Sequence, residues 1–212
     1  MGCISLSQSR GEDIALQCRF FTNSDGDYTC QAEDLRVFRK NSRITQVTGR
    51  HLYGKSNSDV TSFNIEYQET KYLPTGFMTF FPNARTFVVN SSGLKFFTRQ
   101  DMSEATNLRR IFVNFNEIEE LNGDTFTGFN YLETLEMHDN KLRMIGAGIF
   151  DTISSLKFVN FRKNSCINKF YPRDMGFDEM KQEIRQKCGG GRNTIRKMNN
   201  DNDYSSESTG KW

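Results

Sequence analysis

The stretch LRRIFVNFNEI, residues 108–118, is followed by LETLEMHDNKL, residues 132–142, and by LKFVNFRKNSC, residues 156–166. These stretches start 24 residues apart, and each has apolar residues at its first, fourth and sixth positions. Each also has an asparagine at its ninth position, namely Asn116, Asn140 and Asn164. An amphipathic helix would repeat its apolar residues about every 3.6 residues. The observed period instead indicates a stack of structural repeats that share one core.

The same lattice extends upstream and into the second half of each unit. Looser copies begin at Val60 and Ala84, where Gln68 and Ser92 replace the asparagine. Because these residues replace the asparagine whose amide would satisfy unpaired backbone groups, we expect a weaker hydrogen-bond ladder in the first two units. Three further apolar positions recur in the second halves: Leu73, Phe97, Leu121 and Ile145; Met78, Met102, Phe126 and Phe150; Phe81, Ala105, Phe129 and Ile153.

This pattern resembles LxxLxLxxNxL, the signature of the 24-residue leucine-rich repeats of extracellular proteins. The stretch from Leu73-Pro74-Thr75-Gly76 to Phe81-Pro82-Asn83 is similar to the LPxGxFxxLPN turn of that class. The resemblance implies an α/β leucine-rich-repeat solenoid, with a curved parallel sheet on the concave face and an irregular convex side. We place the repeats at residues 60–165.

Both flanks have the features of caps that would cover the exposed ends of a solenoid core. Residues 14–20 and 28–32 alternate apolar and polar residues around a turn-forming segment, residues 23–27, which predicts an N-terminal hairpin. Residues 174–187 have helical periodicity, with Asp174 or Asp178 as the expected N-cap, which predicts a C-terminal helical cap.

These features divide the chain into five predicted segments. Ile44, Val47 and Leu52 suggest a degenerate first repeat, which we include with the N-terminal cap. The predicted segments are a flexible N-terminus, 1–13; the N-terminal cap and degenerate first repeat, 14–59; the repeats, 60–165; the C-terminal cap, 166–188; and a disordered polar tail, 189–212.

Four of the five cysteines form two local pairs that flank the repeats, and Cys3 is left over. Reduced, buried thiols in a cytosolic protein are one interpretation. The positions of the pairs favour the other, disulfides Cys18–Cys30 and Cys166–Cys188 in an oxidising compartment. Leucine-rich-repeat caps usually carry more cysteines, so the resemblance is partial at both ends. No CxxC motif is present and the chain has two histidines, so we expect neither a metal site nor a cofactor.

Side chains between the inward apolar residues of each repeat should face outward on the concave sheet. Three large apolar rings, Phe112, Phe115 and Phe158, fall at such positions. Aromatic anchors ringed by charge are typical of protein-binding surfaces, although the rings could also stack on one another to stiffen the sheet. The predicted binding site consists of Arg110, Phe112, Phe115, Glu136, His138, Phe158 and Arg162.

The expected function is therefore protein recognition of an immune or adhesion type, and the alternative is a structural protein that self-associates as a homodimer through the same patch. We expect no enzyme, because no nucleophile stands at a fixed spacing from His138, which is interpreted as a surface histidine. A net charge of +2 gives no reason to expect nucleic acid, and no apolar run is long enough for membrane insertion.

The expected location is extracellular. No signal peptide is recognised at the N-terminus, so a secreted protein would have lost it. Acylation at Met1-Gly2-Cys3 is not expected, because Leu6 stands where that motif needs serine or threonine. Asn90-Ser91-Ser92 is an N-glycosylation sequon, a short motif that also arises by chance.

Overall fold

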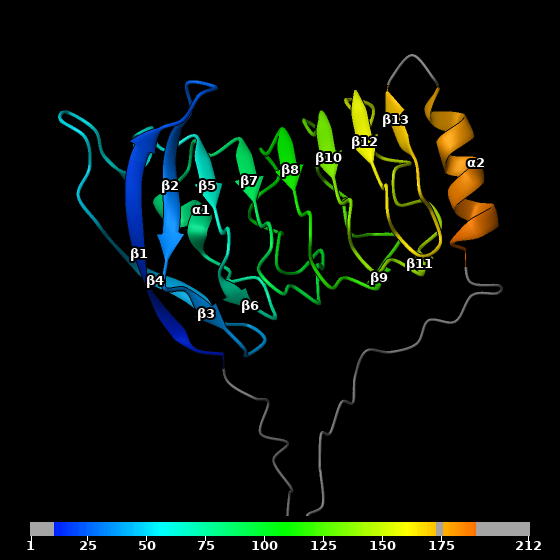
Figure 1. The fold of residues 1–212 in the computed structure, drawn as a ribbon. Helices are drawn as coiled ribbons and strands as arrows, with labels where there is room; N and C mark the ends of the chain where they lie inside the picture. Colours follow the sequence, from blue (N-terminus) through cyan, green and yellow to red (C-terminus); the bar gives the residue numbers. More distant parts are fainter. Residues whose placement is uncertain (1–10, 173–175, 190–212) are drawn as a thin grey trace, which may run out of the picture.

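A computed structural model describes residues 11–172 and 176–189 of the chain. Most of its strands stand side by side in one sheet, in the order β13-β12-β10-β8-β7-β5-β2-β1-β4 (Figure 1). Their bounds are β1 (Asp13–Thr22), β2 (Tyr28–Glu33), β4 (Arg43–Thr48), β5 (Ser62–Asn64), β7 (Thr86–Val88), β8 (Arg110–Phe112), β10 (Thr134–Glu136), β12 (Phe158–Asn160) and β13 (Phe170–Pro172).

The opposite, convex side carries only short elements. Two of its strand pairs are parallel: β3 (Arg36–Val37) with β6 (Glu69–Thr70), and β9 (Glu120–Leu121) with β11 (Met144–Ile145). The 3-10 helix η1 (Asn57–Asp59) and helix α1 (Phe77–Phe80) precede β7 in the chain. Helix α2 (Phe177–Lys187) covers the C-terminal end of the solenoid. The irregular convex side is as predicted.

The 24-residue register of the repeats determines how the strands of the sheet pair. Strands β5, β7, β8, β10 and β12 are parallel, with residues one repeat apart paired directly, as in Phe87 with Ile111. The predicted inward residues Ile111, Val113, Val159 and Phe161 have no exposed surface. Each repeat thus contributes one strand and one layer of core, which confirms the predicted solenoid.

Asparagine side chains tie successive coils together. Asn116 donates from Nδ2 to the Val89 carbonyl at 2.6 Å, and its Oδ1 accepts from the backbone N–H groups of Ser92 and Leu94, both at 3.1 Å. At the first two units the bonds to the preceding coil persist in smaller number. Gln68 accepts there from the Leu35 N–H, and Ser92 donates to a backbone carbonyl and accepts one N–H.

Phenylalanines fill the convex half of the core. Phe126 is fully buried, with its ring centroid 5.8 Å from that of Phe97 and 5.9 Å from that of Phe150. Of the same predicted lane, Met102 is buried and Met78 is half-buried. Ten of the 19 phenylalanines are buried, because every coil must fill the same interior space.

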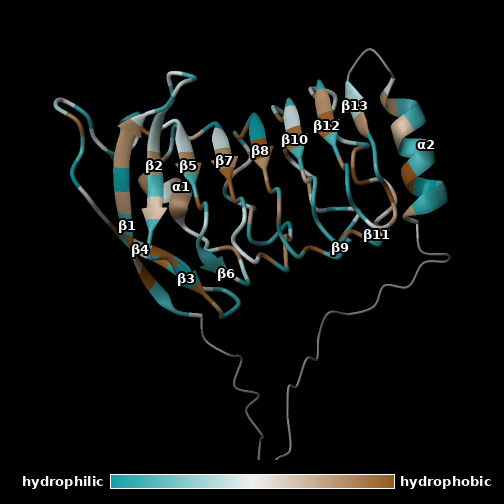
Figure 2. Ribbon diagram, viewed as in Figure 1, coloured by the Kyte–Doolittle hydropathy of each residue, from teal (hydrophilic) through white to brown (hydrophobic). Residues whose placement is uncertain are grey.

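The N-terminal hairpin forms as predicted. Strand β1 alternates hydrophobic and hydrophilic residues (Figure 2) and pairs antiparallel with β2, and β2 then pairs with β5. The disulfide Cys18–Cys30 joins the two strands of the hairpin at a Cα–Cα distance of 5.3 Å. The two cysteines are not paired directly across the strands, because Cys30 lies opposite Phe20. The hairpin is therefore both the cap and the first part of the concave sheet.

The predicted degenerate repeat at Ile44, Val47 and Leu52 is wrong. Residues 43–48 form β4, which runs parallel to β1 at the outer edge of the sheet. Position next to β5 is already taken by β2, so this segment cannot add a coil there. Ile44 is buried beneath the cap, whereas Leu52 stands 46% exposed in the following loop.

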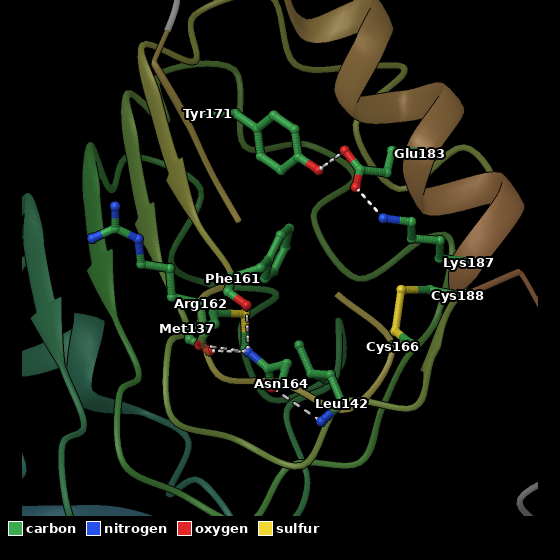
Figure 3. The surroundings of a disulfide bond; sticks show 10 residues. All are labelled: Met137, Leu142, Phe161, Arg162, Asn164, Cys166, Tyr171, Glu183, Lys187 and Cys188. Atoms are coloured by element: carbon green, nitrogen blue, oxygen red, sulfur yellow. Dashed lines mark hydrogen bonds and ion pairs between the residues drawn. A yellow bond between two sulfur atoms is a disulfide. The ribbon is translucent and has the colours of Figure 1, made fainter. Parts of the chain in front are cut away.

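The C-terminal cap is joined by the disulfide Cys166–Cys188, with a Cα–Cα distance of 5.2 Å (Figure 3). Helix α2 begins later than predicted, at Phe177, because Gly176 occupies the N-cap without a side-chain hydrogen bond. Asp178, one of the two predicted caps, lies in the first turn instead. The other, Asp174, lies outside the described residues, as do Cys3, residues 1–10 of the predicted N-terminal segment and residues 190–212 of the predicted tail.

Candidate functional site

The concave face is built from the side chains that alternate with the core residues. On the open side of the sheet, strand pairing places Arg110, Thr134 and Phe158 in one row. It places Phe112, Glu136 and Asn160 in the next row. The predicted site residues on the strands are therefore neighbours, as the repeat register requires.

The N-terminal half of this face is closed. The concave residues of β5 and β7 have exposed fractions of 9% or less: Ser62 1%, Asn64 9%, Thr86 5% and Val88 9%. A large partner has little surface to contact there.

Arg110 helps to close it. Its guanidinium lies 2.5 Å from the Asp27 carboxylate and donates to the Thr86 hydroxyl at 2.9 Å. Asp27, at the tip of the β1–β2 hairpin, also accepts from the Thr61 hydroxyl at 3.0 Å. Arg110 was predicted to face a partner at the rim of the site. It also fastens the cap to the third repeat strand and keeps 35% of its side-chain surface exposed, so its role in partner contact stays a prediction.

The C-terminal half is more open. Phe112, Glu136 and Phe158 are half-buried, so the two rings are less exposed than the sequence predicts. The Phe158 ring centroid lies 6.1 Å from that of Phe170, which accounts for part of its cover. Arg162 is exposed and points away from Phe161 and the core (Figure 3).

Phe115 is the most exposed of the predicted rings, at 52%. It does not lie on a strand, because β8 ends at Phe112. It occupies the turn that follows, with φ of 56°, and its ring meets the His138 ring edge-on at a centroid distance of 4.8 Å. Phe115 is thus placed at the margin of the concave face, where the chain leaves the sheet.

His138 is held between two carboxylates. Its Nδ1 lies 2.8 Å from Asp139 Oδ2, and its Nε2 lies 3.7 Å from Glu136 Oε2. Partial desolvation acts to raise the pKa of Asp139, but the hydrogen bond with His138 and the nearby Lys163 ammonium outweigh it and hold that pKa below its ordinary value. This set of charges fixes the imidazole against the Phe115 ring.

Phe170 belongs to the site and was missed by the sequence analysis. Strand β13 pairs antiparallel with β12 and sets Phe170 opposite Asn160, which extends the concave face beyond the last repeat. The Arg162 guanidinium stacks over the Phe170 ring at 4.2 Å. The alternation of outward Phe170 with buried Tyr171 was an available strand signal. The segment has no counterpart 24 residues away, so the repeat pattern does not predict it.

The structure thus groups the predicted residues into two neighbouring clusters. One contains Phe115, Glu136 and His138, and the other contains Phe158 and Arg162 together with Phe170. We call Phe112, Phe115, Phe158 and Phe170 the aromatic patch.

Asn90, the sequon residue, lies at the edge of the concave face. Its Oδ1 accepts from the Asn114 backbone N–H at 2.9 Å, and its Nδ2 donates to the Glu66 carboxylate at 3.2 Å. The amide is therefore part of a second ladder between coils. Glycosylation at this position stays a prediction.

In residues 11–172 and 176–189, no group of three or more His, Cys, Asp or Glu side chains is arranged to hold a metal ion. None of the helices within these ranges is long and apolar enough to cross a membrane.

A family model and one solved structure agree with the fold. Residues 106–175 match the family model described as leucine rich repeat. A chain of the LRIM1/APL1C complex is 16% identical with a TM-score of 0.54, over 74% of this chain and 27% of that one. A chain of the Drosophila Toll–Spatzle complex is 20% identical with a TM-score of 0.48, over 57% of this chain and 17% of that one. This chain therefore spans less than a third of either structure's chain. No curated protein matches.

Proposed function

We propose that this chain, whose residues 106–175 match the leucine-rich-repeat family model, is a protein-recognition module of an immune or adhesion type. The observation that carries the proposal is the aromatic patch on the C-terminal half of the concave face. Rings that stay partly exposed beside Arg162 and His138 have the composition of a binding hot spot. Exposed rings lower solubility, and a partner that covers them would offset this cost.

The two halves of the concave face support a partner docked off-centre. The N-terminal half is closed by buried side chains and by the Arg110–Asp27 pair. The C-terminal half has aromatic anchors with a charged rim, in which Arg162 could donate charge-assisted hydrogen bonds. The aromatic rings and paired charges of this half support a binding function rather than a catalytic one.

We also propose that the protein acts outside the cell. The two disulfides support this location, because such bonds persist in oxidising compartments. A glycan on Asn90 would fit the same location and is checked by mass measurement of the secreted protein with and without glycosidase treatment.

The binding proposal is tested with Phe158→Ser and Phe115→Ser, each compared with Phe38→Ser. Phe38 is a matched control because it is 56% exposed but follows β3, on the convex side. Proteins captured from extracellular fluid by the wild type and by Phe38→Ser should be lost with the two patch variants. Affinity for a captured protein should fall by about 2 kcal/mol per anchor.

Equal capture by all four proteins would overturn the proposal, as would equal loss with Phe38→Ser. Thermal unfolding of each variant checks that the fold persists. Sedimentation of the pure protein separates the alternative, self-association. A dimer that dissociates with Phe158→Ser would favour it over a distinct partner.

A further inference from the structure

A second surface lies along the edge of the sheet at which β2 and the parallel repeat strands begin. This edge is uppermost in Figure 1. A hollow of about 250 Å³ opens there. Its lining includes Asn83 and Arg85, which precede β7, and Asn107 and Arg109, one repeat later, which precede β8. The backbone N–H of Arg109 donates to the Arg85 carbonyl at 2.8 Å, so the two arginines emerge side by side.

The charge of this hollow is positive. Arg85 is exposed, and no carboxylate within the described ranges forms a salt bridge with it. Arg109 contacts Glu133 at 3.0 Å, but Glu133 also binds Lys157 at 2.6 Å. Among the residues that the structure describes, no acidic side chain lines the hollow itself. A guanidinium in this setting favours a carboxylate or a sulfate, which it can bind through two hydrogen bonds.

The other lining groups are polar or aromatic. Asn83 donates to the Ser58 carbonyl at 2.8 Å, which fixes its side chain, and Asn107 is exposed. Tyr131 borders the hollow with 56% of its surface exposed. Amides can bond hydroxyl groups, and an aromatic ring offers a flat apolar face with a polar tip. These groups together suit a sugar ring that carries an acidic substituent.

A neighbouring hollow of about 530 Å³ shares Pro82 with the first. It is lined by Lys55, His51 and Ser56, and again by no acidic side chain of the described chain. Lys55 itself pairs with Asp59 at 3.4 Å, from outside the lining. This second hollow is also lined by Phe80 and Pro82, so it offers apolar as well as positive surface. Two adjoining hollows with positive side chains suit an extended ligand better than a single ion.

We propose that this flank binds an oligosaccharide bearing sulfate or carboxylate groups, with Arg85 and Arg109 as the acid-binding residues and Tyr131 as the stacking ring. The site is independent of the concave aromatic patch, so either proposal can fail alone. A protein partner is less well suited, because the lining of the first hollow is mainly polar and charged and offers no apolar centre around which a standard interface could form.

The test uses three probes of equal length: a heparin hexasaccharide, a hyaluronan hexasaccharide and a neutral chitin hexasaccharide. Calorimetry should detect binding of one or both acidic probes and no binding of the neutral one. Hyaluronan carries carboxylates alone, whereas heparin carries sulfates as well, so binding of heparin without binding of hyaluronan would assign recognition to sulfate. Arg85→Gln with Arg109→Gln should weaken binding by about tenfold or more.

Arg143→Gln is the matched control, because Arg143 is an exposed arginine on the convex side and lines neither hollow. It should leave the affinity unchanged, whereas Tyr131→Ala should weaken it. The proposal is overturned if the wild type binds no acidic probe, if the neutral probe binds equally, or if Arg143→Gln weakens binding as much as the double variant. Circular dichroism confirms that each exposed-residue variant is folded.

Discussion

Residues in the turn after each repeat strand share an unusual backbone conformation. Tyr67, Ser91, Phe115, Asp139 and Lys163 all have φ between 51° and 57°. This left-handed region favours glycine and asparagine, because other side chains crowd the following carbonyl oxygen. Every repeat has this conformation at the same position. Two of the repeats nevertheless have a large aromatic residue there, Tyr67, which is 81% exposed, and Phe115.

Tyr67→Asn should therefore stabilise the protein. The exposed ring gains little from packing, and asparagine tolerates the left-handed conformation, so we expect a gain of about 0.5–1 kcal/mol in the free energy of unfolding. Urea unfolding measures it. Tyr53→Asn is the control, because Tyr53 is fully exposed without positive φ and should show no gain. An equal effect of the two changes would contradict this explanation.

At the scale of one element, α2 shows how the last coil is covered. Met180 and Ile184 are buried against the core, and the helix ends at the disulfide of Cys188. Glu183 lies between the hydroxyl of Tyr171 and the ammonium of Lys187, at 2.6 Å from each (Figure 3). The Lys187 hydrogen bond first, and then that of Tyr171, lower the pKa of Glu183 from 4.5 to about 2.

Stability should therefore depend on pH through this helix. Because the pKa of Glu183 is lower in the folded state, the unfolded chain binds the proton more readily. The stabilisation is fully present above pH 4.5 and is lost as the pH falls towards 2. Its size is about 1–2 kcal/mol after allowance for solvent screening.

Thermal unfolding from pH 6 to pH 2 provides the measurement for Glu183→Gln. The variant should be less stable than the wild type at pH 6 and should lose less stability on acidification. Glu119→Gln, at a carboxylate outside the cap, should keep the wild-type profile. Parallel profiles for wild type and Glu183→Gln would argue against this role for Glu183.

At the scale of the whole molecule, each coil contacts mainly its neighbours, so the two ends are the places where the core would open first. A disulfide closes each end, across 12 residues at the N-terminus and 22 at the C-terminus. Loops of this size predict a stabilisation of about 3 kcal/mol from each bond in the chain-entropy model.

Replacing Cys166 and Cys188 by serine should loosen the C-terminal coils selectively. Hydrogen exchange should quicken at β12 and β13 while β5 keeps its protection, because the effect passes only from coil to coil. The Cys18→Ser, Cys30→Ser variant should show the opposite distribution. Uniform loss of protection in both variants would mean that the solenoid unfolds as a single unit.

The features that repeat were predictable from the order of the residues. The inward positions, the asparagine ladder, the sheet register and the number of repeat strands all follow from a spacing of 24 residues, which reappears as hydrogen bonds between residues 24 apart. The disulfide pairs were also predictable, because each joins residues close together in the chain at one end of the array. Contacts that recur between adjacent coils require similar residues at a constant spacing, and this spacing can be recognised in the sequence.

The way in which the non-repeating ends meet the repeats became visible in the folded chain and was not predictable from the residue pattern. Arg110 contacts Asp27 across 83 residues, which closes half of the face that the pattern had left open. Phe170 joins Phe158 because a strand outside the repeats adds to the sheet, and β4 turns outward to β1 rather than forming a coil. These contacts depend on how each cap folds back over the array, and a contact made once in the chain has no period from which it could be predicted.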